Sequence, residues 1–103
     1  ISNIFIVKKG VLSTPAVNGY VLAGVTRQVV LELASQASTV CKEKAIAPEE
    51  VLQADEVFLT NTGWEILPAT RVNGKTVGSG RPGLLTQALR RKFRKYVDAE
   101  IGK

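Results

Sequence analysis

Two short polar stretches in this sequence contain residue types that can bind a phosphate group, and the first runs from Ala23 to Arg27. A run with apolar residues at helical spacing follows it, from Gln28 to Lys42. We expect Thr26 to be the N-cap of this helix, and Gly24 to let the backbone approach a neighbouring group closely. Such a helix start presents unpaired N–H groups and the positive end of the helix dipole at one point. An anion, typically a phosphate, can bind there.

The second polar stretch, Thr60 to Gly63, follows a strand that we expect over residues 56–60. Its hydroxyl groups, its amide and its backbone N–H groups could complete a phosphate or oxyanion cradle. An ordinary polar turn has the same composition, so the residues alone leave both interpretations open. No nucleophile–base pair is evident in the chain.

The composition excludes several other kinds of site. The chain has 103 residues, one cysteine and no histidine, and 45% of it is hydrophobic, which is typical of one globular domain. With Cys41 alone, a disulfide framework and a cysteine metal site within the chain are excluded, and a cytoplasmic protein is expected. Catalysis by histidine and the common zinc sites are excluded too, so we expect no metal. No apolar run approaches the roughly 20 residues of a membrane span.

The net charge of +5 lies in the last part of the chain. Residues 81–103 contain seven basic and two acidic residues, whereas residues 1–80 are neutral overall. A helix expected over 84–101 has one apolar stripe (Leu85, Leu89, Phe93, Tyr96, Val97) and one basic face (Arg90, Arg91, Arg94, Lys95). A solvated face is the simplest interpretation, and a nucleic-acid-binding module is the alternative. No aromatic residues interleave with the basic ones for stacking, which weighs against the module.

The remaining pattern predicts an α/β fold, with a mixed sheet, hairpins and two main helices. Strands over 4–7 and 11–13 flank a turn at Lys8–Gly10 and form a hairpin. A second hairpin turns at Asn73–Gly74, the strongest short hairpin signal. Cys41 should lie on the apolar face of the first helix. Further strands are expected over 44–46 and 65–68, with a short helix over 48–54 that begins at Pro48.

Five segments, in this order and spacing, resemble the class IV aminotransferases: Asn3–Lys8, Gly24–Arg27, Ala54–Thr62, Glu65–Pro68 and Gly80–Gly83. This family includes the branched-chain and D-amino acid aminotransferases and 4-amino-4-deoxychorismate lyase, all dependent on pyridoxal 5′-phosphate. The resemblance covers essentially the whole chain but only the C-terminal part of the family's large domain. It therefore implies that residues 1–103 are a single domain, a fragment of the C-terminal, cofactor-phosphate-binding domain of a longer chain.

The resemblance also joins the two polar stretches into one site. It implies that the backbone N–H groups of Val25 and Thr26 and the Thr26 hydroxyl bind the cofactor phosphate, and that Asn61 and Thr62 bind it from the other side. The cofactor-binding residues it implies are Leu22 (against the pyridine ring), Gly24, Val25, Thr26, Asn61 and Thr62, and the substrate-binding residues are Gly63 and Trp64. For Arg27, either an approach to the phosphate or an exposed position is compatible with the sequence.

In this family the lysine that binds the cofactor covalently, and the glutamate paired with the pyridine nitrogen, would both precede Ile1. We therefore expect no catalytic residue in this chain, and no activity from it alone. The intact protein is expected to be a homodimer that transfers an amino group between a branched-chain or D-type amino acid and a 2-oxo acid. The runner-up within the family is the aminodeoxychorismate lyase reaction.

Overall fold

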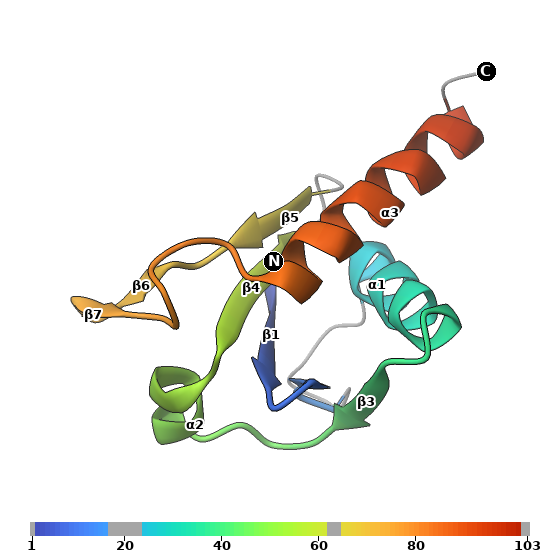
Figure 1. Cartoon of the computed structure of the whole chain (residues 1–103). Helices are drawn as coiled ribbons and strands as arrows, with labels where there is room; N and C mark the ends of the chain where they lie inside the picture. Colours follow the sequence, from blue (N-terminus) through green and yellow to red (C-terminus); the bar gives the residue numbers. More distant parts are fainter. Residues whose placement is uncertain (1, 17–23, 62–64, 102–103) are drawn as a thin grey trace.

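The computed structural model describes residues 2–16, 24–61 and 65–101. In this part of the chain, a five-stranded sheet carries two helices, α1 and α3, that cover one of its faces (Figure 1). The mixed α/β fold with hairpins and two main helices that the sequence predicts is confirmed.

The sheet has the order β3-β2-β1-β4-β5, with β1 (Ser2–Lys8) in the middle. The strand β2 (Val11–Thr14) forms the expected hairpin with β1, and β4 (Glu56–Asn61) runs antiparallel to β1 on its other side. At the two edges, β3 (Val40–Glu43) runs parallel to β2, whereas β5 (Glu65–Pro68) runs antiparallel to β4. The sheet is therefore mixed.

The main core lies between this sheet and the helices α1 (Val25–Gln36) and α3 (Leu84–Ile101). At its centre the rings of Phe5 and Phe58 stack with their centroids 4.9 Å apart. They are opposite one another in the β1–β4 register, so both side chains point to the helix side of the sheet. The predicted stripe of α3 is confirmed, because Leu89 and Phe93 are buried in this core.

The opposite face of the sheet carries smaller elements. The helix α2 (Pro48–Gln53) and the hairpin of β6 (Arg71–Val72) and β7 (Lys75–Thr76) contribute to a second cluster formed by Ile6, Ala54, Val57 and Val77. The hairpin turns where its sequence predicts, because Asn73 and Gly74 both have positive φ angles, 50° and 77°.

The predicted extent of the first helix is wrong at both ends. The helix begins at Val25 with Gly24 as its N-cap, so Thr26 is the second helical residue. It ends at Gln36, because Ser38 adopts a φ of 62° that a right-handed helix does not allow.

The residues after this helix form β3, which occupies residues 40–43 in place of the strand that we expected over 44–46. Cys41 therefore lies in a strand, where it pairs with Leu12, and is not on the helix. Its apolar spacing fits a helix and a strand equally, and pairing with β2 decided between them.

Candidate functional site

The start of α1 lies directly against β1. Gly24 has a φ of −79° and a ψ of 149°, which any residue can adopt, so its backbone conformation does not require glycine. A side chain would nevertheless be crowded: a Cβ at this position would lie 3.1 Å from Oδ1 of Asn3, tighter than nine in ten real Cβ contacts, so that the neighbour would have to move by a few tenths of an ångström. The close approach that the sequence indicates at Gly24 is therefore an approach to the side chain of Asn3.

No residue within the first turn of α1 neutralises the positive end of the helix dipole. Its N-cap Gly24 offers no side-chain hydrogen bond, and none of its first-turn residues is acidic. Val25 is exposed, whereas Thr26 is almost fully buried. A helix normally has its first N–H groups satisfied by a cap, by water or by a ligand. The N-cap residue therefore does not satisfy these N–H groups with a side chain, and the positive end of the helix dipole favours an anion at this place.

The end of β4 approaches the same place from the sheet. Thr60 is opposite Asn3 in the register of β1 and β4, two residues beyond Phe58 and on the same side of the sheet. Thr60 is completely buried, and its hydroxyl has no hydrogen-bond partner among the described residues. Asn61 follows at the end of the strand, opposite Ser2. Asn3 thus contacts the N-terminus of α1 and pairs with the end of β4, so the two polar stretches converge on it.

Four of the site residues that the family resemblance implies lie outside the described residues. They are Leu22, in the segment before Gly24, and Thr62, Gly63 and Trp64, in the segment between β4 and β5. Both segments directly continue elements that are described at this site.

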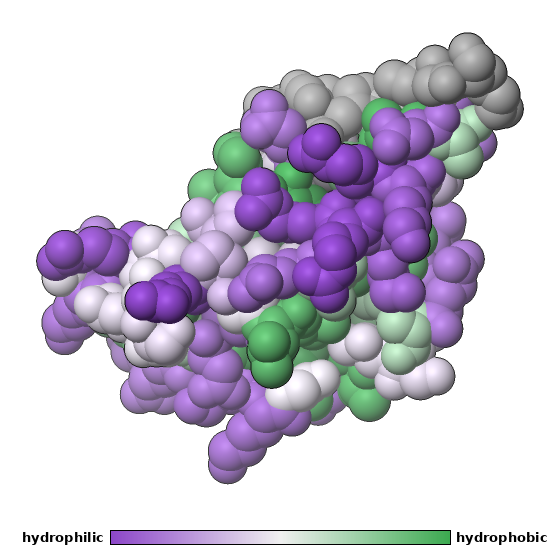
Figure 2. Space-filling model, turned by 45° about the horizontal axis from the view of Figure 1, so that its top comes forward, coloured by the Kyte–Doolittle hydropathy of each residue, from purple (hydrophilic) through white to green (hydrophobic). Residues whose placement is uncertain are grey.

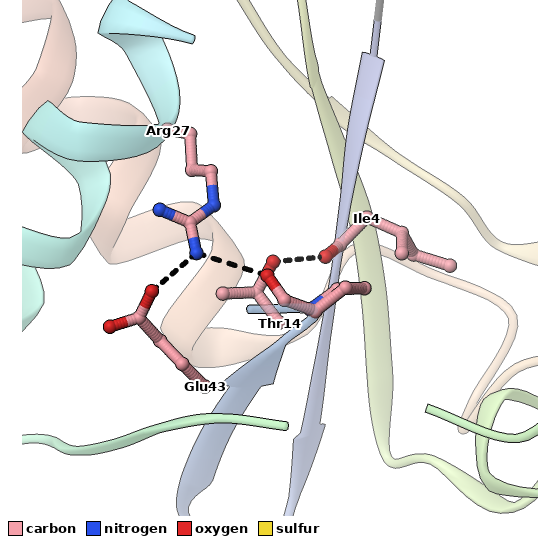
Figure 3. Close-up of polar contacts among 5 residues, drawn as sticks. Ile4, Thr14, Arg27 and Glu43 are labelled. Carbon is pink, nitrogen blue, oxygen red and sulfur yellow. Dashed lines mark hydrogen bonds and ion pairs between the residues drawn. The ribbon is translucent and has the colours of Figure 1, made fainter. Parts of the chain in front are cut away.

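Arg27 is not on the surface: it is 1% exposed and is the largest fully buried side chain among the described residues. Figure 3 shows its guanidinium reaching from α1 toward β2 and β3. Nη2 donates to the carbonyl oxygen of Pro15 at 3.0 Å and to Oε1 of Glu43 at 2.6 Å. Glu43 itself is about half exposed. Of the two positions that the sequence leaves open for Arg27, the exposed one is therefore wrong, and the guanidinium bonds Glu43 and Pro15.

The residues that hold Arg27 were missed by the sequence interpretation. Glu43 is 16 residues away from Arg27 and reaches it only because β3 pairs with β2. Thr14, the partner of Glu43 in this pairing, is buried and donates its hydroxyl to the Ile4 carbonyl oxygen at 2.7 Å (Figure 3). An acidic residue in a short polar strand has no local signature that would reveal such a contact.

Other kinds of site find little support in the described residues. No three histidine, cysteine, aspartate or glutamate side chains there come together to hold a metal ion. None of the described helices has the length and apolarity needed to cross a membrane. The basic face of α3 is exposed, and Figure 2 shows hydrophilic residues gathered along this helix. Exposure is expected both of a solvated face and of a nucleic-acid-binding one, so it does not decide between the two interpretations.

Comparison with known proteins identifies the family. Residues 1–72 match the family model described as amino-transferase class IV. The chain belongs to this family. It is 38% identical over 102 residues to a D-alanine aminotransferase of Bacillus licheniformis, covering 99% of this chain and 36% of that protein. It is 42% identical over 101 residues to a branched-chain-amino-acid aminotransferase of Pseudomonas aeruginosa, covering 98% of this chain and 32% of that protein.

Solved structures of class IV aminotransferases have the same fold. The branched-chain amino acid aminotransferase from Escherichia coli superposes with a TM-score of 0.86 at 38% identity, over 90% of this chain and 32% of that one. The T.th. branched-chain amino acid aminotransferase, crystallised with pyridoxamine 5′-phosphate, gives a TM-score of 0.90 at 26% identity, over 97% of this chain and 33% of that one. This chain therefore spans about a third of the length of the relatives that it matches.

Proposed function

We propose that this chain is the cofactor-phosphate-binding part of a pyridoxal-phosphate-dependent aminotransferase, and that it belongs to the C-terminal domain of a longer protein. The observation that carries the proposal is the convergence of two polar groups on Asn3: the N-terminus of α1, whose N-cap glycine offers no side-chain hydrogen bond, and the buried Thr60 hydroxyl, without a partner among the described residues. A buried hydroxyl without a partner costs stability unless a polar group reaches it. A phosphate at this place would use donors from both sides.

Each residue of the site has a distinct role in this proposal. Val25 and Thr26 donate their backbone N–H groups to the phosphate, and Thr26 adds its hydroxyl. Asn61 and Thr62 bind the phosphate from the end of β4. Gly24 lets the first turn of α1 sit close to β1, because no side chain separates it from Asn3. The phosphate is thus held as a handle, which fixes the position of the rest of the cofactor.

The remaining residues would face the ring and the substrate. Leu22 packs against the pyridine ring in this proposal, and the turn of Gly63 and Trp64 faces the substrate carboxylate. When bound, pyridoxal phosphate supplies an electron-withdrawing ring that stabilises negative charge on the substrate α-carbon. The chain contributes binding and orientation to this chemistry. The lysine that binds the cofactor covalently, and the glutamate that faces its ring nitrogen, belong to the part of the protein before Ile1.

The reaction we propose is the transfer of an amino group from an amino acid to a 2-oxo acid. Relatives named as D-alanine and as branched-chain-amino-acid aminotransferases are similarly close to this chain, at 38% and 42% identity. Both substrate classes therefore remain within the proposal, as does a cytoplasmic homodimer as the form of the intact enzyme.

Two threonine variants of the full-length protein test the phosphate assignment. Thr26→Ala and Thr62→Ala each remove a hydroxyl donor to a dianion, and a charge-assisted bond of this kind is worth about 1.5–3 kcal/mol. We expect roughly tenfold to hundredfold weaker binding of pyridoxal phosphate to each apoenzyme in an equilibrium titration. The matched control is Thr76→Ala, an exposed threonine of β7, which should leave the affinity unchanged. Unchanged affinity in both site variants would remove the phosphate assignment.

A further inference from the structure

The buried guanidinium of Arg27 connects three elements that meet beside the proposed phosphate site. Arg27 is the third residue of α1, directly after Thr26. Its Nη2 atom bonds the carbonyl oxygen of Pro15, which follows β2, and a carboxylate oxygen of Glu43, the last residue of β3. A single nitrogen atom therefore ties the first turn of α1 to the ends of two strands.

The buried position of Arg27 in the first turn of α1 is not one that maximises the stability of the fold. A cation at the start of a helix is repelled by the positive end of the helix dipole, and α1 has no acidic residue in its first turn to offset this. The Nε atom of Arg27 is buried and has no hydrogen-bond partner among the described residues. Burying a charged group is costly, and well-packed apolar residues often give equal or greater stability. Stability alone therefore does not explain why an arginine is buried here, whereas a role in positioning α1 does.

We infer that Arg27 is a positioning residue for the phosphate site, and that Glu43 holds it in place. This inference rests on the proposed function. Because Thr26 and Arg27 are consecutive in the first turn, any rotation of α1 that releases Arg27 also moves the N–H group and hydroxyl of Thr26. Donors to an anion must be held to a fraction of an ångström, and small displacements at such sites cost large factors in function. The guanidinium is bound to Glu43 and Pro15, so it acts through α1 and is not itself a ligand of the phosphate.

Replacing Glu43 distinguishes this role from a long-range charge effect, because the two predict opposite signs. If Arg27 acted only as a nearby positive charge, removing the Glu43 carboxylate would leave that charge less neutralised and would tighten anion binding. If Arg27 acts by position, the same change loosens the first turn of α1 and weakens binding. Glu43 is half exposed, so its replacement leaves no internal cavity, but it removes the carboxylate partner of a buried guanidinium, and the folding of each variant must therefore be measured.

The experiment measures the binding of inorganic phosphate to the cofactor-free, full-length protein by titration calorimetry. The variants are Glu43→Ala, Glu43→Gln and Arg27→Lys, and circular dichroism establishes that each is folded at the titration temperature. We expect about tenfold weaker binding for Glu43→Ala and Arg27→Lys, a change that corresponds to 1.4 kcal/mol. Glu43→Gln retains an acceptor for Nη2, so its phosphate affinity should fall less than that of Glu43→Ala. Arg71→Lys is the matched control, since exposed Arg71 donates to the Gly74 carbonyl oxygen within its own hairpin, and it should bind as the wild type does.

Other results would count against the inference. Lower melting temperatures with unchanged phosphate affinity would show that the contact serves stability alone, and tighter binding by Glu43→Ala would show a charge effect. Either result overturns the positioning role while leaving the phosphate site intact. If Arg27→Lys does not fold, Glu43→Ala decides. If Thr26→Ala and Thr62→Ala both bind phosphate as the wild type does, the phosphate site itself is wrong, and the role of Arg27 is refuted with it.

Discussion

Asn3 of β1 and Gly24 at the start of α1 fit so closely that a Cβ on residue 24 would lie 3.1 Å from the Asn3 Oδ1 atom. Asn3 is also opposite Thr60 of β4 and is almost fully buried. The central strand of the sheet thus sets how near the helix N-terminus comes to the end of β4. This distance decides whether one phosphate can use donors from both.

Adding a methyl group at Gly24 should therefore separate the two sides of the site. We expect Gly24→Ala in the full-length protein to weaken phosphate binding about tenfold, because the new methyl group crowds the buried Asn3 side chain and pushes it and the first turn of α1 apart. Overpacking of this kind also lowers the free energy of unfolding by about 1–3 kcal/mol. Calorimetric titration with phosphate and chemical denaturation measure the two effects.

A double-mutant cycle with Asn3→Ala tests whether the contact is the cause. Removing the Asn3 amide makes room for the new methyl group, so the two changes together should cost less than the sum of their separate costs. Strictly additive costs would mean that Gly24 is required for a reason other than its contact with Asn3.

The N–H groups at the start of α3 are hydrogen-bonded to a side chain from the sheet. Glu56 at the start of β4 accepts hydrogen bonds from the backbone N–H groups of Leu85 and Thr86, at 3.2 and 2.7 Å, and from the Thr86 hydroxyl, at 2.7 Å. α3 therefore has an acidic partner from outside the helix at its N-terminus.

Replacing Glu56 should destabilise the full-length protein without a direct effect on the phosphate site. We expect Glu56→Ala to lower the free energy of unfolding by about 2–4 kcal/mol, because it leaves three donors without their acceptor and removes a favourable charge at the helix N-terminus. Thr86→Val removes only one of the three bonds and should cost clearly less. Urea denaturation measures both, and equal costs for the two variants would contradict the role of Glu56 as the cap of α3.

The sequence predicts the local features of this fold well but not those that depend on contacts between distant residues. The α3 helix and both hairpins follow from local patterns: an apolar stripe at helical spacing, and turns such as Asn73–Gly74. The end of α1 did not, because Val40 and Cys41 continue the apolar spacing of the helix. Only pairing with β2 makes these two residues a strand, and that partner lies about 30 positions away in the chain.

The site shows the same division. A glycine before a helix and a polar strand end could be recognised as two half-sites, but the sequence does not say that Asn3 lies between Gly24 and Thr60. The burial of Arg27 could not be predicted either, since an arginine in a first helical turn is usually solvated. Its partner Glu43 is brought to it by the parallel pairing of β3, for which nothing in the local sequence is diagnostic.

Loss of a contact at the turn between β1 and β2 should lower the stability of the fold at acid pH. The backbone N–H of Lys9 donates to the Asp55 carboxylate at 2.8 Å, and this bond, aided by the charge of Lys8, lowers the pKa of Asp55 below its ordinary value. A carboxyl group with a lowered folded-state pKa stabilises the fold above its unfolded-state pKa of about 3.9. That contribution is lost as the pH falls through the lower, folded-state pKa.

Asp55→Asn should therefore be less stable than the wild type near neutral pH, and the difference should shrink as the pH falls below about 4. Melting temperatures of the full-length protein between neutral pH and about pH 3 measure this effect. Asp98→Asn, which replaces an exposed carboxylate of α3, is the control. A difference between Asp55→Asn and wild type that stays constant over this range would contradict the linkage.

Residues 1–103 on their own should not transfer amino groups. The two lysines whose ammonium contacts the structure gives are both held against α2, on the sheet face opposite α1: Lys8 bonds the Gln53 carbonyl oxygen, and Lys44 bonds Glu50. Neither lysine can present an amine beside the N-terminus of α1. Contacts to the cofactor phosphate alone would leave the reacting carbon of the cofactor without a base. We expect the isolated chain, mixed with pyridoxal phosphate, D-alanine or leucine, and 2-oxoglutarate, to form glutamate no faster than the cofactor alone, whereas the full-length protein turns over. Turnover at an enzyme's rate that disappears in one lysine variant of the isolated chain would place the reacting amine within these residues and refute its assignment to the preceding part of the protein.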